Sequence, residues 1–453
     1  MSSLLQHRRA GVLLHPTSLP SGKLDADVER WLDFMQDAGL SVWQVLPLVI
    51  PDHTGSPYQS CSAFAADPGL LGDVVPEAGG LDARAAFYWR QRDWLPDYAR
   101  FVVLKQFFPG QAWNDWPPHY RDRDAEAMAD FDARYAEQID GVMHEQFLLE
   151  QRWQEIRGHA AQRNILLFGD VPIFVAFDSA DVWANRDQFL LDETGQPEFV
   201  AGVPPDYFSE TGQRWGNPHY DWEVMQHNGF GWWQARMQRQ LDWFDIIRID
   251  HFRGLEACWM IRADCATAID GFWEKVPGAE LLGTLRQSFD DLPIVAEDLG
   301  IITPEVTELR RRFELPGMAV VQFAFDAFED NPHKPVNIQA DQVAYSGTHD
   351  NNTTRGWFDS LDPDTRQFVL ETLGAQAQDD IVQLMMRRVL ETRANLAILP
   401  LQDILGLGEE ARMNRPGLTE GNWAWRFDWS QISAEHARAV RALVTETGRL
   451  YEG

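Results

Sequence analysis

The chain is poor in cysteine, poor in positive charge and free of long apolar runs. Its three cysteines, Cys61, Cys258 and Cys265, show no Cys-x-x-Cys spacing, which argues against a disulfide framework or a zinc site and indicates free thiols. No stretch approaches the roughly 18 apolar residues of a membrane span. The first residues lack the apolar region and cleavage site of a secretory signal, so we expect a cytoplasmic protein without a membrane segment.

Basic residues are scarce relative to acidic ones. The chain has 39 Lys and Arg against 69 Asp and Glu, which gives a net charge of −30. Such a surface repels phosphate backbones, so nucleic acid is not an expected partner. A neutral substrate is indifferent to this field, and we interpret the acidity as a contribution to solubility rather than to catalysis.

Several sequence motifs of metal, nucleotide and serine chemistry are missing. There is no His-Glu-x-x-His, no P-loop and no Gly-x-Gly-x-x-Gly after a strand. The Gly-x-Ser-x-Gly of serine hydrolases is also absent. His15 has no second histidine two residues later, which weakens the case for a metal-dependent barrel hydrolase. We therefore expect neither a metal nor an organic cofactor.

Short β-rich runs recur along the chain, and each ends in a polar motif. Their near-continuous apolar cores are typical of parallel strands covered on both faces. Helical patterns lie between most of them, although the connection at 328–342 shows none. This alternation predicts an α/β fold, a (β/α)8 TIM barrel, rather than a doubly wound sheet. The eight predicted strands are 11–18, 41–48, 165–174, 244–252, 292–300, 318–326, 343–350 and 396–403.

Two long segments interrupt the predicted barrel. Residues 49–164, after the second strand, read as a mainly helical insertion, and residues 175–243, after the third, are rich in loops and aromatic residues. No internal repeat or flexible linker separates them from the rest. We therefore predict a single catalytic barrel over 1–453, with both insertions packed on it as subdomains.

Three carboxylates stand where an apolar strand gives way to a polar loop: Asp250, Glu297 and Asp350. A charge at that position is costly unless something there uses it. The carboxyl ends of barrel strands meet at one face, so these side chains should share one site. Arg248 lies two residues before Asp250 and should share its face, where a guanidinium keeps the carboxylate ionised as a nucleophile requires.

The three carboxylates together point to sugar chemistry. Burial of Glu297 should raise its pKa toward that of a general acid. One ionised and one protonated carboxyl group, about 5–5.5 Å apart, are what a retaining glycosidase needs. Asp350, preceded by His349, would then hold sugar hydroxyls in the transition state. A strand-end cap or an ion pair explains any one of these acids alone, but three at equivalent positions favour a site.

Nineteen tryptophans form a second signal, because a pyranose stacks its apolar face on an aromatic ring. Each Trp taken singly is better explained as core. The segment 205–222 interleaves aromatic residues with Asn, Gln and Asp, as an amphipathic sugar ligand requires. This arrangement favours Tyr58, Tyr207 and Trp215 as sugar platforms.

An ordered set of motifs resembles the amylomaltases, which are 4-α-glucanotransferases of the α-amylase clan of retaining barrel enzymes. The resemblance runs from about residue 10 to about residue 426. The motifs are HPTSLPSG, GSPYQSCSAF, GDVPIFVAFDSADVWAN, VAGVPPDYFSETGQRWGNPHYDW, RIDHFRG, AEDLG, GTHDNNTTRGWF and LQDILGLGEEARMNRPG.

The resemblance implies a double displacement on α-1,4-glucans, with Asp250 as nucleophile, Glu297 as acid/base and Asp350 as transition-state stabiliser. It implies no cofactor, and α-1,4-glucans as the binding partner. The implied contacts to the sugar in the central subsite are Asp170, Arg248 and His349, and the implied groove residues are Tyr58, Tyr207, Gln213, Trp215 and Asn414.

Two alternatives stay open beside glucan transfer. A retaining α-glucan hydrolase shares the same triad and the same covalent intermediate, so only the loop and aromatic motifs, through the resemblance, favour transfer. A non-catalytic carbohydrate-binding barrel would be expected to have lost at least one of the carboxylates, and none is lost.

Overall fold

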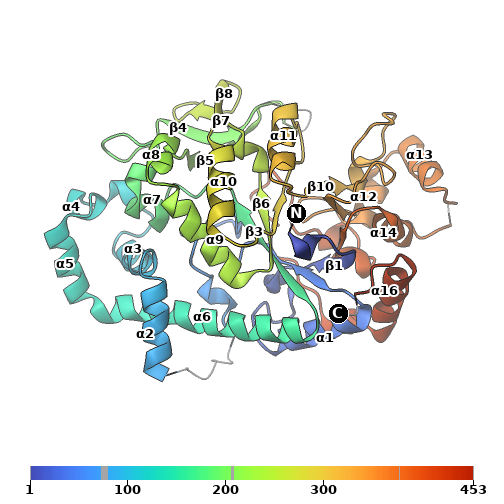
Figure 1. Ribbon diagram of the computed structural model, residues 1–453, viewed down its shortest axis with the longest axis horizontal. Coiled ribbons are helices and arrows are strands. Elements are labelled where there is room, and N and C mark those ends of the chain that lie inside the picture. The colour runs from blue at the N-terminus through green and yellow to red at the C-terminus, as the bar shows by residue number, and fades with distance from the viewer. Residues whose placement is uncertain (1, 73–79, 206–208, 377, 452–453) are drawn as a thin grey trace.

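A parallel sheet of eight strands forms the centre of the molecule in a computed structural model that describes residues 2–72, 80–205, 209–376 and 378–451 (Figure 1). The strand order is β10-β11-β12-β1-β2-β3-β6-β9. Each strand overlaps one of the eight predicted runs, and β1, β10 and β11 begin one or two residues before them, so the eight predicted strands are confirmed. Their bounds are β1 (Arg9–Leu13), β2 (Val42–Gln44), β3 (Leu166–Pro172), β6 (Ile246–Asp250), β9 (Ile294–Ala296), β10 (Gly317–Val320), β11 (Gln342–Tyr345) and β12 (Leu396–Pro400).

The sheet closes between β9 and β10, the two strands at the ends of this order. The backbone N–H of Ala296 donates to the carbonyl of Pro316 at 2.8 Å. Asp298 reinforces the closure, because its Oδ1 accepts a hydrogen bond from the Met318 N–H at 2.7 Å and its Oδ2 lies 3.2 Å from Nε of Arg310. The predicted (β/α)8 barrel is therefore confirmed.

Helices cover the outside of the barrel between consecutive strands. The β10–β11 connection has no α-helix over residues 328–342, all of which are described, as the sequence predicted. The barrel helices are α1 (Ala26–Ala38), α10 (Gly278–Ser288), α11 (Pro304–Arg312), α12 (Thr354–Ser360), α13 (Pro363–Leu373), α14 (Ile381–Glu391), α15 (Leu401–Ile404) and α16 (Ala434–Glu446).

The connection from β2 to β3 carries a lobe of helices on one side of the barrel, at the left of Figure 1. Its longest helix runs beneath the others and buries Phe147, Trp153 and Ile156 on its inner face. The Trp153 indole N–H donates to the Trp243 carbonyl at 2.9 Å, which anchors the lobe to the next connection. The helices are α2 (Gly80–Arg90), α3 (Leu95–Phe107), α4 (Pro118–Arg121), α5 (Ala125–Arg134) and α6 (Ala136–Gln162).

A second, antiparallel sheet lies above the barrel mouth and was not predicted from the sequence. Its order is β5-β4-β7-β8, so strands from the third and fourth connections join in one sheet. The members are β4 (Phe199–Val203), β5 (Gln213–Pro218), β7 (Ala257–Arg262) and β8 (Gly271–Lys275), and the third connection also holds α7 (Ala180–Ala184), α8 (Trp222–His227) and α9 (Gly231–Trp243).

One glycine in the barrel wall is required by close packing. A Cβ at Gly169 would lie 2.2 Å from Cδ2 of Phe244, far inside contact distance. The absence of a side chain lets the Phe244 ring press on β3 next to Asp170. This packing fixes the strand that carries Asp170.

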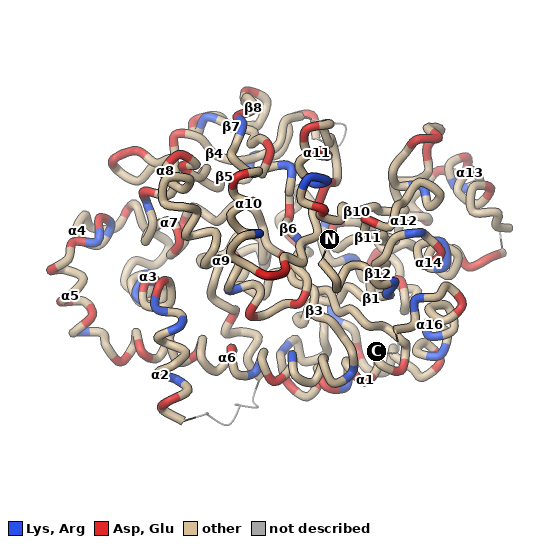
Figure 2. The backbone as a smooth tube through the Cα atoms, in the orientation of Figure 1, with Lys and Arg blue, Asp and Glu red and all other residues tan. Residues whose placement is uncertain are grey.

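The acidic residues are distributed over the outer helices and loops of both the barrel and the helical lobe (Figure 2). Within the described residues, no helix is long and apolar enough to cross a membrane.

The contacts of Asp298 at the barrel closure predict that this residue contributes to the stability of the fold. Asp298→Ala leaves the buried Arg310 guanidinium with only the longer contact to Asp341, 3.4 Å from Nη1, so we expect the free energy of unfolding to fall by about 3 kcal/mol. Urea unfolding followed by tryptophan fluorescence measures this. Asp290→Ala, an exposed acid on the connection before β9, is the control and should leave the midpoint unchanged. Equal midpoints for the two variants would contradict a structural role of Asp298.

Candidate active site

A buried arginine joins two carboxylates at the mouth of the barrel. Asp170 on β3 and Arg248 on β6 are direct neighbours in the strand register. Arg248 donates from Nη1 to Oδ2 of Asp170 and from Nη2 to Oδ1 of Asp250, each at 2.6 Å. The Asp170 side chain has no exposed surface, whereas 30% of the Asp250 side chain is exposed. The structure thus places Arg248 beside Asp250, as the alternation of side chains predicted, and leaves Asp250 open to a ligand.

Glu297 follows β9 and lies beside Asp250. Since Ile249 pairs with Ala296 in the parallel ladder, Asp250 and Glu297 occupy equivalent positions one residue further along. Burial, with the negative charge of Asp250, raises the pKa of Glu297 to about 8 against the opposing effect of Arg248. A carboxyl group of this kind carries a proton at neutral pH, which is the state of a general acid.

Backbone donors fix both oxygens of Glu297. Oε2 accepts a hydrogen bond from the His251 N–H at 2.8 Å, and Oε1 accepts one from the Leu299 N–H at 3.0 Å. His251 takes a left-handed backbone conformation with φ of 53°, which is strained for a residue with a side chain. This turn directs its N–H toward Glu297.

The antiparallel sheet brings aromatic and amide groups to the same end of the barrel. The Trp215 ring meets the His251 ring edge to face at 4.9 Å, and its indole N–H donates to Oε1 of Gln213 at 3.1 Å. Burial lowers the pKa of His251 to about 4, so the ring is neutral at physiological pH. Gln213 and Trp215 thus border the space next to Asp250 and His251.

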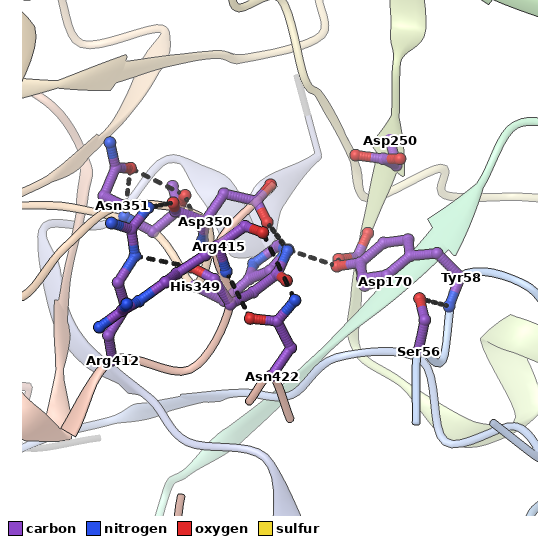
Figure 3. A network of polar contacts seen from close by, with 12 residues as sticks. Ser56, Tyr58, Asp170, Asp250, His349, Asp350, Asn351, Arg412, Arg415 and Asn422 are labelled. Carbon is purple, nitrogen blue, oxygen red and sulfur yellow. Dashed lines mark hydrogen bonds and ion pairs between the residues drawn. The ribbon is translucent and has the colours of Figure 1, made fainter. Parts of the chain in front are cut away.

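Tyr58 links the loop after β2 to the opposite side of the barrel. Its hydroxyl donates to Oδ2 of Asp170 at 2.7 Å and lies 3.0 Å from Nε2 of His349. The Tyr58 and His349 rings are stacked, with centroids 5.3 Å apart and an interplanar angle of 12°. Figure 3 shows this line of contacts from Asp170 through Tyr58 to His349 and Asp350.

Asp350 receives its contacts from the loop after β12. Oδ1 of Asp350 accepts a hydrogen bond from Nδ2 of Asn414 at 2.6 Å and lies 3.4 Å from Nε2 of His349. Arg412 donates to the Asp350 carbonyl at 2.8 Å. The Asp350 side chain is 45% exposed, so it can still meet a ligand from above.

Trp423 belongs to this cluster but was missed in the sequence. Its ring centroid lies 5.9 Å from those of both Tyr58 and His349. It sits in the segment GNWAW, with a left-handed φ of 62°. Only its position among glycine and asparagine in a loop could have singled it out.

Asp403 was also missed, and it supports the loop that carries His349 and Asp350. Its buried carboxylate accepts hydrogen bonds from Oγ of Ser346 at 2.6 Å, from the Thr354 N–H at 2.8 Å and from Oγ1 of Thr354 at 2.7 Å. Asp403 holds both ends of the loop. The signal was present, because Asp403 also follows an apolar strand.

Most residues selected from the sequence meet at the carboxyl ends of the barrel strands or in the loops above them. Tyr207 lies outside the described residues. In the part of the chain that the structure describes, no three His, Cys, Asp or Glu side chains gather as metal ligands. The residues brought together are Tyr58, Asp170, Gln213, Trp215, Arg248, Asp250, Glu297, His349, Asp350 and Asn414.

A parallel barrel with a protonated acid beside a second carboxylate at its mouth is typical of enzymes that act on glycosidic bonds. The sequence profile of the family described as 4-alpha-glucanotransferase matches residues 13–74 and 77–431. The chain is 42% identical over 497 positions to a 4-alpha-glucanotransferase of Thermus thermophilus, covering 98% of this chain and 99% of that one. A Synechocystis 4-alpha-glucanotransferase is 42% identical over 95% of this chain and 96% of its own.

The structure is also similar to that of an amylomaltase from Streptococcus agalactiae in complex with acarbose. The TM-score is 0.93 and the identity 31%, over 98% of this chain and 99% of that one. The chain therefore belongs to the 4-α-glucanotransferase family, and the resemblance to amylomaltases is confirmed.

The contacts of Glu297 predict how its pKa responds to a change at Asp250. Asp250→Asn removes the neighbouring negative charge, so we expect the pKa of Glu297 to fall from about 8. Carbon-13 NMR of labelled glutamate carboxyl groups, assigned with Glu297→Gln, measures the shift. Asp350→Asn is the matched control and should leave this pKa in place. A pKa that is equal in the enzyme and in Asp250→Asn would show that the two carboxyl groups do not interact.

Proposed function

We propose that this enzyme transfers α-1,4-glucan segments to the 4-hydroxyl of an acceptor sugar by a retaining double displacement. Asp250 is the nucleophile, Glu297 the acid/base and Asp350 the transition-state stabiliser. The observation that carries the proposal is the difference in surroundings between two neighbouring carboxyl groups, Asp250 at the end of β6 and Glu297 directly after β9. An Arg248 N–H donates to Asp250 at 2.6 Å, while burial and the charge of Asp250 raise the pKa of Glu297 to about 8.

In the first step, protonated Glu297 donates its proton to the glycosidic oxygen of the donor glucan. Oδ2 of Asp250 accepts no hydrogen bond within the described structure and attacks the anomeric carbon. The bond from Asp250 to the sugar forms as the bond to the leaving oxygen breaks. Arg248 holds the other Asp250 oxygen and so fixes the direction of attack.

In the second step, Glu297 is a carboxylate and removes the proton from the acceptor 4-hydroxyl. The acceptor oxygen then attacks the anomeric carbon and displaces Asp250, which restores the original configuration. Water in place of the acceptor would give hydrolysis, the alternative function. Family membership supports transfer, and the aromatic groove of Tyr58, Trp215 and Trp423 supports retention of a sugar acceptor.

The remaining polar residues are proposed to bind the sugar between these carboxylates. Asp170, Tyr58 and His349 form one hydrogen-bonded row, and Asp350 with Asn414 forms the next. A sugar with several hydroxyls can replace contacts within these rows. The partner is thus an α-1,4-glucan, and the acarbose complex of the Streptococcus agalactiae amylomaltase supports this ligand class.

The two connections, residues 49–164 and 175–243, are proposed to act as subdomains of a single barrel that shape the glucan groove. The free state of Cys61, Cys258 and Cys265 supports the cytoplasm as the compartment.

A maltotriose assay separates transfer from hydrolysis. We expect a ladder of longer oligomers with free glucose and a constant number of reducing ends, because each transfer forms one glycosidic bond for each that it breaks. Rising reducing ends would instead establish hydrolysis. Asp250→Ala should abolish both reactions while circular dichroism shows an intact fold, and Asp290→Ala is the control. An active Asp250→Ala variant would overturn the assignment of the nucleophile.

The pH dependence of transfer follows from Glu297. The first step needs its proton, so kcat/KM should fall to about half near pH 8 and decrease about tenfold per pH unit well above it. Initial rates on maltotriose at constant ionic strength, from pH 6 to pH 10, measure this limb. A rate that is independent of pH up to 10 would rule out Glu297 as the acid.

A further inference from the structure

A cavity of about 300 Å³ lies between the two long connections, away from the catalytic carboxylates. It is bordered by the start of α3, by α7 and by the start of α9, so both connections contribute to its wall. The two cavities beside the barrel mouth each have about 30 Å³. A single water molecule needs a cavity of roughly 10–15 Å³, so the cavity of about 300 Å³ has room for a small organic ligand.

The walls of this cavity combine aromatic rings with amide and carboxylate groups. Trp94 and Trp232 are half-buried and both contact Phe64, the first stacked at 5.8 Å and the second edge to face at 5.7 Å. Gln188 and Asn228, which also line the cavity, are joined by a hydrogen bond of 3.0 Å. Aromatic rings combined with planar polar groups are the lining that a sugar ring requires.

One buried polar atom at the cavity lacks a partner, and one carboxylate there is only partly used, within the described structure. Asp181 is 5% exposed, and only its Oδ2 accepts a hydrogen bond from another residue, the Ala63 N–H at 2.8 Å. The indole N–H of Trp232 is buried and has no partner. Buried polar atoms are rarely left without a partner, so the Trp232 N–H indicates a missing acceptor beside the cavity, and Oδ1 of Asp181 is free to accept from a ligand.

The charges around the cavity limit the class of ligand. None of the described residues that line the cavity is Lys, Arg or His. Three lining residues are acidic: Asp93, Asp97 and Asp181. Asp97 already pairs with Arg100 and Arg123, each at 2.8 Å. An anionic ligand such as a sugar phosphate is therefore disfavoured, and a neutral ligand rich in hydroxyl groups is favoured.

We propose that this cavity binds a neutral α-glucoside of one or two rings, of the glucose and maltose class, at a site separate from the catalytic one. The sugar ring packs against Trp94 and Trp232, and its hydroxyls donate to the open oxygen of Asp181 and bond to Gln188. None of the proposed catalytic or sugar-binding residues lines the cavity. Occupancy of this site therefore does not require the transfer reaction.

The experiment counts maltose sites by isothermal titration calorimetry. Asp250→Asn serves as the parent, so that no turnover occurs, and the maltotriose assay verifies its inactivity independently. We expect two maltose sites in the parent. Ala235→Trp, added on the exposed rim of the cavity, should remove one of them. Gln238→Trp is an exposed position on the same helix outside the lining and should keep both.

Asp181→Asn provides a second variant that keeps the size of the side chain and its bond from Ala63. It should weaken the second maltose site about tenfold, as the loss of a charged hydrogen-bond acceptor does. A single maltose site in the parent would overturn the proposal, and so would two unchanged sites in Ala235→Trp. Displacement of maltose by tetramethylammonium in preference to glucose would also overturn it, because the cavity would then be a site for organic cations.

Discussion

The buried guanidinium of Arg248 is the interaction on which the rest of the site depends. A cation inside a barrel is costly unless carboxylates compensate it with good geometry, and the planar fork of arginine reaches two of them at 2.6 Å. Asp170 is fully buried as a result, while Asp250 stays partly exposed. Asp170 then accepts the hydroxyl of Tyr58, which ties the loop after β2 to the barrel mouth.

Neighbouring strands give two similar side chains different surroundings. Asp250 on β6 receives a charged donor, whereas Glu297 after β9 receives backbone N–H groups and a buried environment. Their separation is set by the spacing of paired parallel strands, about 4.8 Å, and not by flexible loops. The barrel closure beside Asp298 holds β9 in this register, so the proton on Glu297 depends on the integrity of the barrel itself.

Local patterns in the sequence were sufficient for the strands and for the residues at their ends. The Ile and Val runs predicted all eight strands, and the alternation of side chains placed Arg248 beside Asp250. The antiparallel sheet was missed because its four strands come from two connections and pair only after the barrel has formed. Trp423 was missed for the same reason, since its contacts with Tyr58 and His349 join segments far apart in the sequence.

The proposed chemistry itself does not decide between sugar and water as the acceptor, because Glu297 can take a proton from either. In the proposed mechanism, the choice between sugar and water depends on the groups that bind the acceptor next to the glycosyl enzyme. These groups must hold the sugar there longer than a water molecule stays. Trp215 comes from the antiparallel sheet, and Tyr58 and Trp423 come from loops on the other side of the mouth. In the proposed mechanism, therefore, the barrel supplies the retaining chemistry, while the connections that were hardest to predict supply the preference for transfer.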